Sequence, residues 1–596
     1  MCALLVACTV SLGASAQSPV GQANSVTDNS SEQTAFSQAR DRWIKRSRYR
    51  RLLAAVYREN GGGPIFFQDG QPTAVARTLY FAVKSLDKHA VDRSPYWLGY
   101  GEDNYQWKEK KKQPRRKRRQ PPQPLELVSV EEPLKVAEFD VRLAHALTQY
   151  VVDFRVLHKA HPRYQQRKLE SVLQRAETDI LGHISRLLTV DQMRLESLWP
   201  KTSAYKVLLA ARSKYRELRQ KEKAKELRLP KLNWRRWRRA YRKKKLPEKL
   251  VTGLQVRLAI EEFYLGEPHG RYDYETDNAL RRARRAHNLL EDGGVDYYFA
   301  IRANKSIRYR LDAINVSLQR LRESARLRRG LSSYIRINIP AFELEVVEHG
   351  RVTRRHRVIV GNNKLDFNRH DWKQGYLNRT PLLETQVKQV IVNPRWRPPP
   401  RILDEEFEGQ EKVIVEPGPK NPLGYVKFTL ERTNAVFMHD TNKRAKFQKT
   451  VRAYSHGCIR VHEALDLAEY ITTRYTDTDT SAFSEAHQSK QTRTFKLSTE
   501  LPLFVEYQTV DEASSGELRF FPDVYRYDRA WVRGNAPINQ ARYGGGRLRP
   551  KNVPSIPHDD YKRLKAAGGK APTEWPVGGA SPDAVGGGTA QEQVVE

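Results

Sequence analysis

The sequence is poor in thiols, with three cysteines in 596 residues. Cys2 and Cys8 lie in a short apolar segment at the N-terminus, which leaves Cys458 as the one thiol in the rest of the chain. A single thiol cannot form an intramolecular disulfide, so the composition excludes a small fold held together by disulfide bonds. Cys458 is therefore either a chemically reactive residue or an inert buried side chain.

Long apolar runs are also scarce. Residues 1–16 are apolar and end in Ala14, Ser15 and Ala16, which is typical of a signal peptide cleavage site, although no lysine or arginine precedes the apolar run. This segment is too short to span a bilayer, and no later apolar run is long enough. We therefore expect a soluble protein exported to the periplasm by an N-terminal signal peptide. Lipid attachment at Cys8 is the alternative.

Acidic residues are outnumbered, and the net charge is +36. The excess is concentrated in residues 108–119, with nine bases and one acid, and in residues 201–250, with twenty bases and four acids. Aromatic residues interleave with the bases in residues 233–241, a pattern that would indicate nucleic-acid binding in a cytosolic protein. For an exported protein we expect no nucleic acid, and anionic polymers of the cell envelope as partners instead. A solvated helix face and a loop are the simpler alternative.

Hydrophobic periodicity divides the chain into regions. Apolar residues recur at three- and four-residue steps in residues 137–150, 164–188 and 307–321, which predicts helices there. Glycines and Asp273 punctuate a smaller helical bundle after Leu250. In chain order we expect a signal peptide (1–16), a flexible lead-in (17–40), a helical scaffold domain (41–245) with a basic disordered insertion at about 105–125, a helical module (246–303), a connecting helix (304–330), a mostly β domain (331–530) and a disordered tail (531–596).

The period of the apolar residues changes to two at Tyr334. This predicts a β-hairpin around the turn at residues 348–351. Further strands are predicted at residues 387–392, 425–430, 435–438 and 495–507. The predicted fold class is therefore multidomain α+β, mainly helical in the N-terminal scaffold and the small module, and mostly β in the domain that contains Cys458.

A proline-rich segment, residues 393–400, interrupts these strands. Its sequence, NPRWRPPP, cannot form a regular strand or a helix interior. We expect a loop near the reactive residues, in which Trp396 serves as a wall or a lid that excludes water.

The residues around Cys458 favour a reactive thiol. In an extended segment His456, Cys458 and Arg460 share one face, and His439 ends a predicted strand that could lie alongside. A helix predicted over residues 461–471 would direct the positive end of its dipole toward the sulfur. A thiol is mostly protonated at neutral pH, so a nucleophilic cysteine requires such a base or positive field. An inert buried cysteine would instead have apolar neighbours.

Metal binding is an alternative use of the same residues. His439, His456, Cys458 and His462 could supply a set of zinc ligands. The segment from His462 to Asp466 lacks the second histidine of a zinc protease motif. We therefore expect no metal and no cofactor.

A series of motifs around the thiol resembles the L,D-transpeptidases, which are cysteine acyltransferases of bacterial peptidoglycan. His439, a fifteen-residue spacer and the segment Ser455–Arg460 resemble the signature of that family. Other segments stand in the family's order: Ile339–Leu344, Thr380-Pro381, Asn393–Trp396, Pro417–Gly424, Met438–Thr441, Arg452 and Asp523–Asp528. The resemblance therefore implies that residues 331–530 form an L,D-transpeptidase catalytic domain.

The upstream half is similar to that of the large periplasmic members of the family, which carry a helical scaffold and a peptidoglycan-binding module. Leu254-Gln255, Gly270–Asp273 and Ala279-Leu280 match the pattern of that module. Residues 281–286 depart from it, because arginines stand where the family has a Phe-Gln pair. This departure weakens the expectation that residues 246–303 bind glycan.

The resemblance implies roles for the residues of the site. Cys458 would be the nucleophile, and His439 the base, oriented by the backbone carbonyl of Asp440. The amides around Gly457 and Cys458 would hold the oxyanion, with His456 nearby. The implied substrate-binding residues are Arg460, Ser455, Tyr454 and Trp396. Arg460 would bind a substrate carboxylate, and a structural ion pair is its alternative role.

The implied reaction is a two-step acyl transfer between peptidoglycan stem peptides. A thioester on Cys458 would form with loss of a terminal D-alanine, and an amine of a second stem would then give a 3→3 cross-link. The alternatives are an L,D-carboxypeptidase or endopeptidase, a transferase that attaches a lipoprotein, and a non-catalytic wall-binding scaffold. The sequence leaves the oligomeric state open.

Overall fold

The structure is a computed structural model. It describes residues 26–68, 71–84, 86, 133–152, 173–174, 176–188, 199–364, 366–368, 373–399, 402–403, 407, 412–431, 433, 436–513 and 516–532. The predicted signal peptide, the basic insertion at about 105–125 and residues 533–596 of the predicted tail lie outside this part of the chain. Among the described residues, none of the helices combines the length and the apolar character needed to cross a membrane.

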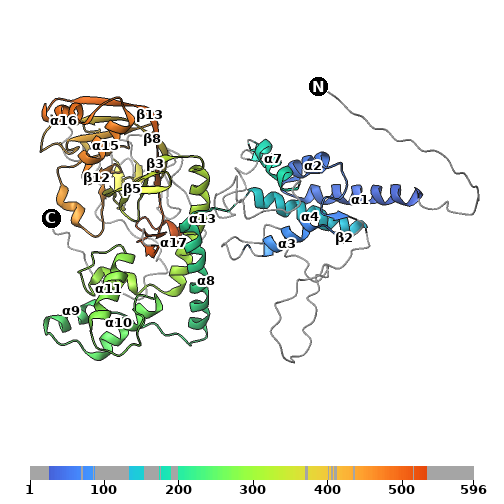
Figure 1. Ribbon diagram of the computed structural model, residues 1–596, viewed down its shortest axis with the longest axis horizontal. Coiled ribbons are helices and arrows are strands. Elements are labelled where there is room, and N and C mark those ends of the chain that lie inside the picture. The colour runs from blue at the N-terminus through green and yellow to red at the C-terminus, as the bar shows by residue number, and fades with distance from the viewer. Residues whose placement is uncertain are drawn as a thin grey trace, which may run out of the picture. The chain divides into compact units, whose positions relative to one another are not determined.

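The chain divides into two compact units (Figure 1). The first contains the residues up to 205, apart from Lys159–Tyr164, together with Leu321–Arg326, and the second contains most of the remainder. The first unit is built from α1 (Val26–Arg46), α2 (Arg50–Glu59), α3 (Ala74–Lys84), α4 (Pro133–Val151) and α7 (Glu177–Leu188), with the short strands β1 (Phe67–Gln68) and β2 (Gln71–Pro72). This confirms a mainly helical N-terminal region.

Helix α1 corrects one expectation. Residues 17–40 were expected to form a flexible lead-in, but α1 begins at Val26 and continues through this segment. Phe36, Ala39 and Ile44 are buried in the core of the first unit, where α1 packs against α4. The polar composition of the segment concealed a sparse apolar stripe at helical spacing.

The second unit begins with helices that include a small module. They are α8 (Ser203–Lys223), α9 (Trp234–Arg242), α10 (Glu248–Ile260), α11 (Tyr274–Ala286), α12 (Tyr297–Ala303) and α13 (Ile307–Leu327). The first residues of α8, up to Tyr205, and Leu321–Arg326 of α13 belong to the first unit. The basic helix α9 packs with this module, because Trp237 is buried in the same core as Leu254 and Phe299. Asn233 caps α9 by accepting hydrogen bonds from the amides of Arg235 and Arg236.

The β domain is a nine-stranded sheet whose strands follow the order β11-β5-β12-β10-β9-β8-β13-β3-β4. An additional pairing of β5 with β4 closes the sheet into a barrel-like arrangement. Its strands are β3 (Ser333–Asn338), β4 (Glu343–Glu348), β5 (Arg351–Gly361), β8 (Leu383–Val392), β9 (Val426–Leu430), β10 (Met438–His439), β11 (Ala453–Ser455), β12 (Ile459–Val461) and β13 (Arg493–Glu506).

Most of the predicted strands are present, and the predicted α+β fold class is confirmed. Alternating residues such as Ile335, Ile337 and Val358 face one core, which α15 (Ala464–Tyr475) and α16 (Thr480–Gln488) also line. Short strand pairs β6 (Asp366–Asn368) with β7 (Lys373–Gly375) and β14 (Val510–Glu512) with β15 (Leu518–Phe520) lie outside the main sheet. Helix α17 (Tyr527–Val532) is the last described element.

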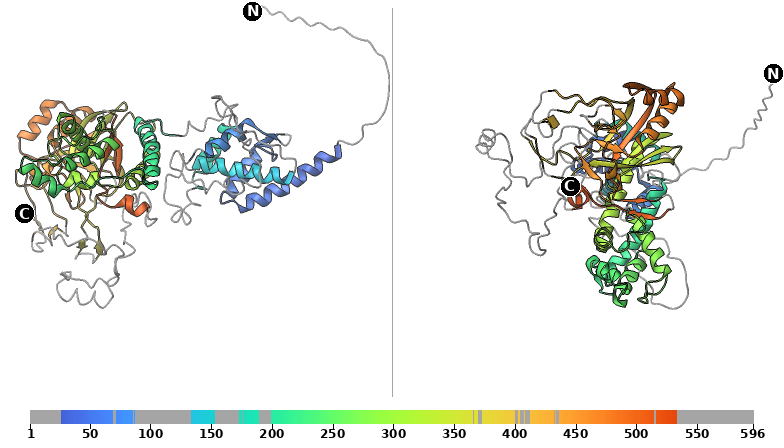
Figure 2. Two further views of the ribbon diagram at one scale, coloured as in Figure 1. Left: turned by 90° about the horizontal axis from the view of Figure 1, so that it is seen from below. Right: turned by 90° about the vertical axis from the view of Figure 1, so that its left-hand side faces the viewer.

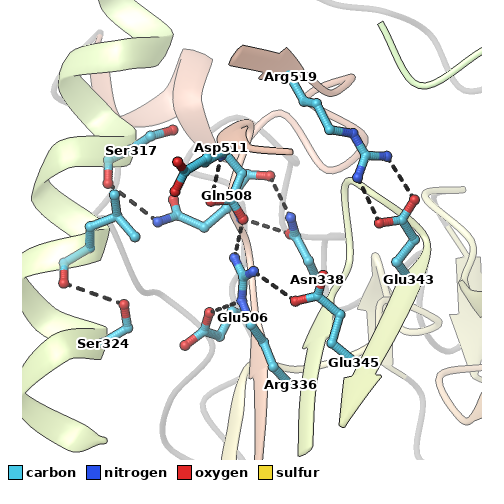
Figure 3. A network of polar contacts seen from close by, with 12 residues as sticks. Ser317, Ser324, Arg336, Asn338, Glu343, Glu345, Glu506, Gln508, Asp511 and Arg519 are labelled. Carbon is cyan, nitrogen blue, oxygen red and sulfur yellow. Dashed lines mark hydrogen bonds and ion pairs between the residues drawn. The ribbon is translucent and has the colours of Figure 1, made fainter. Parts of the chain in front are cut away.

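A buried polar network joins the barrel to α13 (Figure 3). Arg336 of β3 forms ion pairs with Glu345 of β4, Glu506 of β13 and Asp511 of β14. The Ser317 hydroxyl of α13 accepts a hydrogen bond of 3.0 Å from the amide of Val510. Because each buried charge has a partner of opposite sign, removing one member would leave the others uncompensated.

The module packs against the β domain at Phe520 of β15. The Phe520 ring lies 5.9 Å from that of Tyr215 and 6.2 Å from that of His287, and the Arg310 guanidinium lies 4.7 Å from its centre. Figures 1 and 2 show the green helices of the module on one side of the yellow-to-orange sheet. These contacts make the module and the β domain parts of one compact unit.

A buried acid lies at this junction. The Glu261 carboxylate pairs with Arg310 at 2.6 Å and with His287 at 3.2 Å. Burial by itself would raise the pKa of Glu261, but the charges of Arg310 and His287 outweigh it and lower the pKa to about 2. Since the folded-state pKa lies below the ordinary value, the ionised carboxylate stabilises the fold above about pH 4.5. That contribution is lost as the pH falls toward about 2.

We therefore expect Glu261→Gln to destabilise the second unit by about 3 kcal/mol at pH 7, because it leaves Arg310 buried without a counter-charge. The difference from the unaltered protein should shrink as the pH falls from about 4.5 toward 2. Calorimetric unfolding of the full chain measures both effects. Glu262→Gln is the matched control, because Glu262 is 69% exposed in its pair with Lys214. Equal unfolding temperatures for the two variants would contradict the expectation.

Candidate active site

Cys458 lies between two short strands, β11 and β12, and is partly buried. The expected extended segment from His456 to Arg460 is wrong at its start, because His456 and Gly457 form a bend in which Gly457 has a φ of +120°. A side chain at Gly457 would be strained in this conformation. His456 is exposed, whereas Cys458 lies at the entry of β12 on the same side as Arg460.

The bend is fixed by hydrogen bonds from buried hydroxyl groups. Ser455 Oγ donates to the carbonyl of Cys458 at 2.5 Å and accepts from the amide of Gly457 at 3.2 Å. Thr380 Oγ1 donates to the carbonyl of Gly457 at 2.8 Å, and the amide of Gly361 donates to the same oxygen of Thr380. The Gly457 amide, predicted to help bind an oxyanion, is thus committed to Ser455 in this structure.

Tyr525 stabilises the backbone of Gly361 and Thr380, which in turn hold the bend. Its hydroxyl donates to the carbonyl of Gly361 at 2.7 Å and accepts from the amide of Thr380 at 3.1 Å. Tyr525 and Thr380 are both buried. Both residues lie in segments that resemble the family's motifs, for which the sequence indicated no role. The structure shows that they hold the backbone next to the thiol.

His439 lies on β10, the strand next to β12. β10 pairs in parallel with β12, which sets Met438 opposite Ile459 and His439 opposite Arg460. The carbonyl of Phe437 accepts the amide of Ile459 at 3.0 Å, and the Phe437 backbone also hydrogen-bonds the Cys458 side chain. Of the expected strand at residues 435–438, residue 435 lies outside the described residues, and the strand observed there is β10, Met438–His439.

Asp440 determines the orientation of the His439 ring. Nδ1 of His439 contacts the carbonyl oxygen of Asp440, and because a carbonyl can only accept, Nδ1 carries the proton. Nε2 is then the basic nitrogen. The Asp440 carboxylate is itself held by the amide of Tyr425 at 3.0 Å and by Arg444 at 2.8 Å.

The electrostatic environment keeps both reactive groups neutral at rest. Burial, with the charge of Arg460 and then that of Lys427, lowers the pKa of His439 to about 3 against the opposing hydrogen bond to Asp440. Burial raises the pKa of the Cys458 thiol above its usual range. The Phe437 backbone and the charges of Lys427 and Arg460 partly oppose that rise. These shifts favour a protonated thiol and a neutral imidazole in the folded protein.

Lys427 is the charged residue that the sequence analysis missed. It lies on β9, directly opposite His439 in the antiparallel pairing of β9 with β10. Its position in a predicted strand was available from the sequence, but no local pattern indicated that this strand would neighbour the one that ends in His439.

The helix that follows the thiol does not begin where it was predicted. Strand β12 comes first, Glu463 then adopts a left-handed conformation with φ of +54°, and α15 begins at Ala464. The helix N-terminus therefore lies six residues after Cys458 in the chain.

The predicted substrate-binding residues differ from one another in their exposure and in their neighbours. Arg460 and Ser455 lie beside Cys458, and Tyr454 is 41% exposed, with the Lys446 ammonium 5.3 Å from its ring centre. Burial raises the pKa of Tyr454, and Tyr298 of α12 adds to that rise. Trp396 is buried, and its contacts within the described residues are with Val415 and Phe407 of its own loop.

The described residues assemble no group of three or more histidine, cysteine or acidic side chains suited to a metal ion. His462, one of the four zinc ligands considered above, packs against Phe447 instead, with ring centres 5.0 Å apart. The zinc alternative therefore lacks its ligand set.

Two family profiles match separate parts of the chain. Residues 332–480, which contain both His439 and Cys458, match the family profile of an L,D-transpeptidase catalytic domain. Residues 51–211 match the profile of a scaffold domain. A curated protein of Haemophilus influenzae, whose name provisionally assigns it to the L,D-transpeptidases, is 26% identical over 230 residues. That match covers 32% of this chain and 44% of the relative, less than half of its length.

Two solved structures resemble part of the chain. An L,D-transpeptidase from Xylanimonas cellulosilytica is 16% identical, with a TM-score of 0.16, over 43% of this chain and 92% of that one. An L,D-transpeptidase from Stackebrandtia nassauensis is 12% identical, with a TM-score of 0.17, over 43% of this chain and 89% of that one.

Gly424 offers a test of how His439 is oriented. Gly424 has a φ of +62°, and a Cβ there would lie 2.3 Å from Oδ2 of Asp440. We expect Gly424→Ala to displace Asp440 and misorient His439, and so to slow alkylation of Cys458 by iodoacetamide at pH 7 at least about tenfold. Gly350→Ala is the matched control, because Gly350 has a φ of +77° but open space around it. If both variants fold and react at the same rate, Asp440 does not orient the base.

Proposed function

Since the chain carries an L,D-transpeptidase catalytic domain, we propose that it forms 3→3 cross-links between peptidoglycan stem peptides through a thioester on Cys458. The observation that best supports this proposal is the parallel pairing of β10 with β12, which brings a histidine with a basic Nε2 beside a partly buried thiol. A wall-binding scaffold alone would need neither the thiol nor the oriented histidine.

The first step of the proposed reaction forms the acyl-enzyme. Nε2 of His439 accepts the thiol proton while the Cys458 sulfur attacks the carbonyl of the L-centre of the diamino acid in a tetrapeptide stem. The bond between that carbonyl carbon and the nitrogen of the terminal D-alanine then breaks. His439 returns the proton to the departing amine, which leaves a thioester.

The second step transfers the acyl group to an acceptor. An amine of a second stem attacks the thioester carbonyl and gives up a proton to His439. The carbon–sulfur bond breaks, the sulfur regains a proton, and the 3→3 cross-link is complete. Water attacking in place of the amine would give an L,D-carboxypeptidase, so the site must exclude water to favour transfer.

Arg460 and the substrate-facing residues have proposed roles in this reaction. Arg460 lies opposite His439 and would bind a carboxylate of the stem. Ser455 would hold the Gly457 bend rather than touch substrate, given its hydrogen bonds to Gly457 and Cys458. Tyr454 is exposed beside the site and would contact the stem. The loop of Trp396 remains our proposal for excluding water.

We propose that the protein acts in the periplasm, where its proposed substrate lies, and that its basic residues make further contacts there. On α9, Arg235, Arg236, Arg238 and Arg239 are exposed while Trp237 is buried, so the helix presents a row of cations to solvent. We propose that this face binds anionic envelope polymers, with an attraction that salt screens. Replacing all four with glutamine should lower cosedimentation with sacculi at low salt, and the difference should vanish above about 0.5 M salt.

Muropeptide analysis tests the proposed reaction. Sacculi or tetrapeptide stems incubated with the protein should yield 3→3 dimers and free D-alanine, and Cys458→Ala should abolish both, because it removes the nucleophile. Carbapenem treatment should add one covalent adduct, located by mass spectrometry at Cys458.

The products also distinguish the alternatives. Tripeptides without dimers would identify a carboxypeptidase, and loss of existing dimers an endopeptidase. A stem joined to the amine of a lipoprotein lysine would identify a lipoprotein-attaching transferase. Unchanged muropeptides with retained sacculus binding would indicate a scaffold and refute the proposed cross-linking.

A further inference from the structure

Three side chains form a row across adjacent strands of the sheet. In the antiparallel pairing of β9 with β10, Lys427 lies opposite His439, and in the parallel pairing of β10 with β12, His439 lies opposite Arg460. Directly paired residues project on the same face of a sheet. His439 is therefore flanked by a cation on each side, and Cys458, two residues before Arg460, shares that face.

Lys427 is held in place rather than extended into solvent. Its ammonium lies 4.1 Å from the centre of the Phe437 ring, a cation–π contact. The Phe437 ring in turn lies 5.6 Å from the His439 ring. Lys427 is half-buried, and burial lowers its pKa while the charge of Cys458 raises it. An amphipathic side chain in this position is pre-organised, since the aromatic contact limits where the ammonium can go.

Charged and titratable groups of three strands and of the preceding bend lie near Cys458. They are Lys427 from β9 and Arg460 from β12, together with the neutral His439 from β10, and the exposed His456 belongs to the preceding bend. A protonated His439 would lie between two cations, so an ion pair of thiolate and imidazolium is disfavoured here.

The thiolate therefore requires a counter-charge other than the imidazolium. We propose that Lys427 supplies that charge, stabilising the Cys458 thiolate while His439 carries the proton only in transit. Arg460 is then released to interact with a substrate carboxylate. Lys427 would thus support the reaction by stabilising the thiolate. Its relevance to catalysis rests on the proposed function.

The pH dependence of Cys458 alkylation by iodoacetamide tests this role, because it requires no peptidoglycan substrate. Lys427→Met keeps the length and apolar stem of the side chain but removes the charge. We expect the midpoint of the alkylation profile to move upward by about one pH unit, and the rate at pH 7 to fall about tenfold. Lys427→Arg keeps the charge and the aromatic contact, and should leave the midpoint near that of the unaltered protein.

Lys446→Met is the matched control. Lys446 also lies over an aromatic ring, that of Tyr454 at 5.3 Å, and its charge interactions are with Lys443 and Arg460. We expect its alkylation midpoint to be unchanged. The measurements use the full chain, and circular dichroism before titration establishes that each variant is folded.

The outcomes separate this role from others. An unchanged midpoint in folded Lys427→Met overturns the proposal, as does an equal shift in Lys427→Met and Lys427→Arg, which would indicate packing rather than charge. A raised KM for the stem peptide with no shift in the midpoint would indicate substrate binding and also overturns it. A shift confined to Lys427→Met supports the proposal even if the muropeptide assay shows no cross-links, so failure of the proposed function is recognised separately.

Discussion

The site depends on one backbone interaction, the parallel pairing of β10 with β12. The hydrogen bond from the Ile459 amide to the Phe437 carbonyl fixes the register of two very short strands. A shift by one residue would turn His439 to the other face of the sheet. Neither strand is long enough to hold its register alone, so the barrel must supply it. The strands on either side, β9 and β5, are longer and pair with β10 and β12 respectively.

Burial at this position has two opposite effects. It makes the thiol a weaker acid and the imidazole a weaker base, and both changes oppose spontaneous ionisation. The same burial strengthens the influence of fixed charges, because a low dielectric screens them less. The cations of Lys427 and Arg460 therefore oppose the effect of burial on the pKa of the thiol, although burial outweighs them. A thiol that is protonated at rest is also protected from adventitious oxidation, which follows thiolate character.

The sequence predicted what local patterns can encode. The alternation of Ile335 with Ile337 predicted β3, the apolar stripe from Ile307 predicted α13, and the single thiol with its neighbouring histidines predicted where the chemistry lies. The role of Lys427 and the support given by Thr380 and Tyr525 could not be predicted, because they arise from strand neighbours and loops far apart in the chain. The bend at Gly457 was missed for a different reason, since alternation assumes a regular strand and a φ of +120° breaks it.

The buried junction between the module and the β domain gives the site a fixed boundary. Separating them would expose the Phe520 ring and remove Glu261 and Arg310 from a shared low-dielectric environment. The exposed residues Tyr297, Tyr298 and Ile301 of α12 are therefore held at a constant position relative to the sheet. The junction thus fixes which exposed aromatic side chains of the module accompany the β domain.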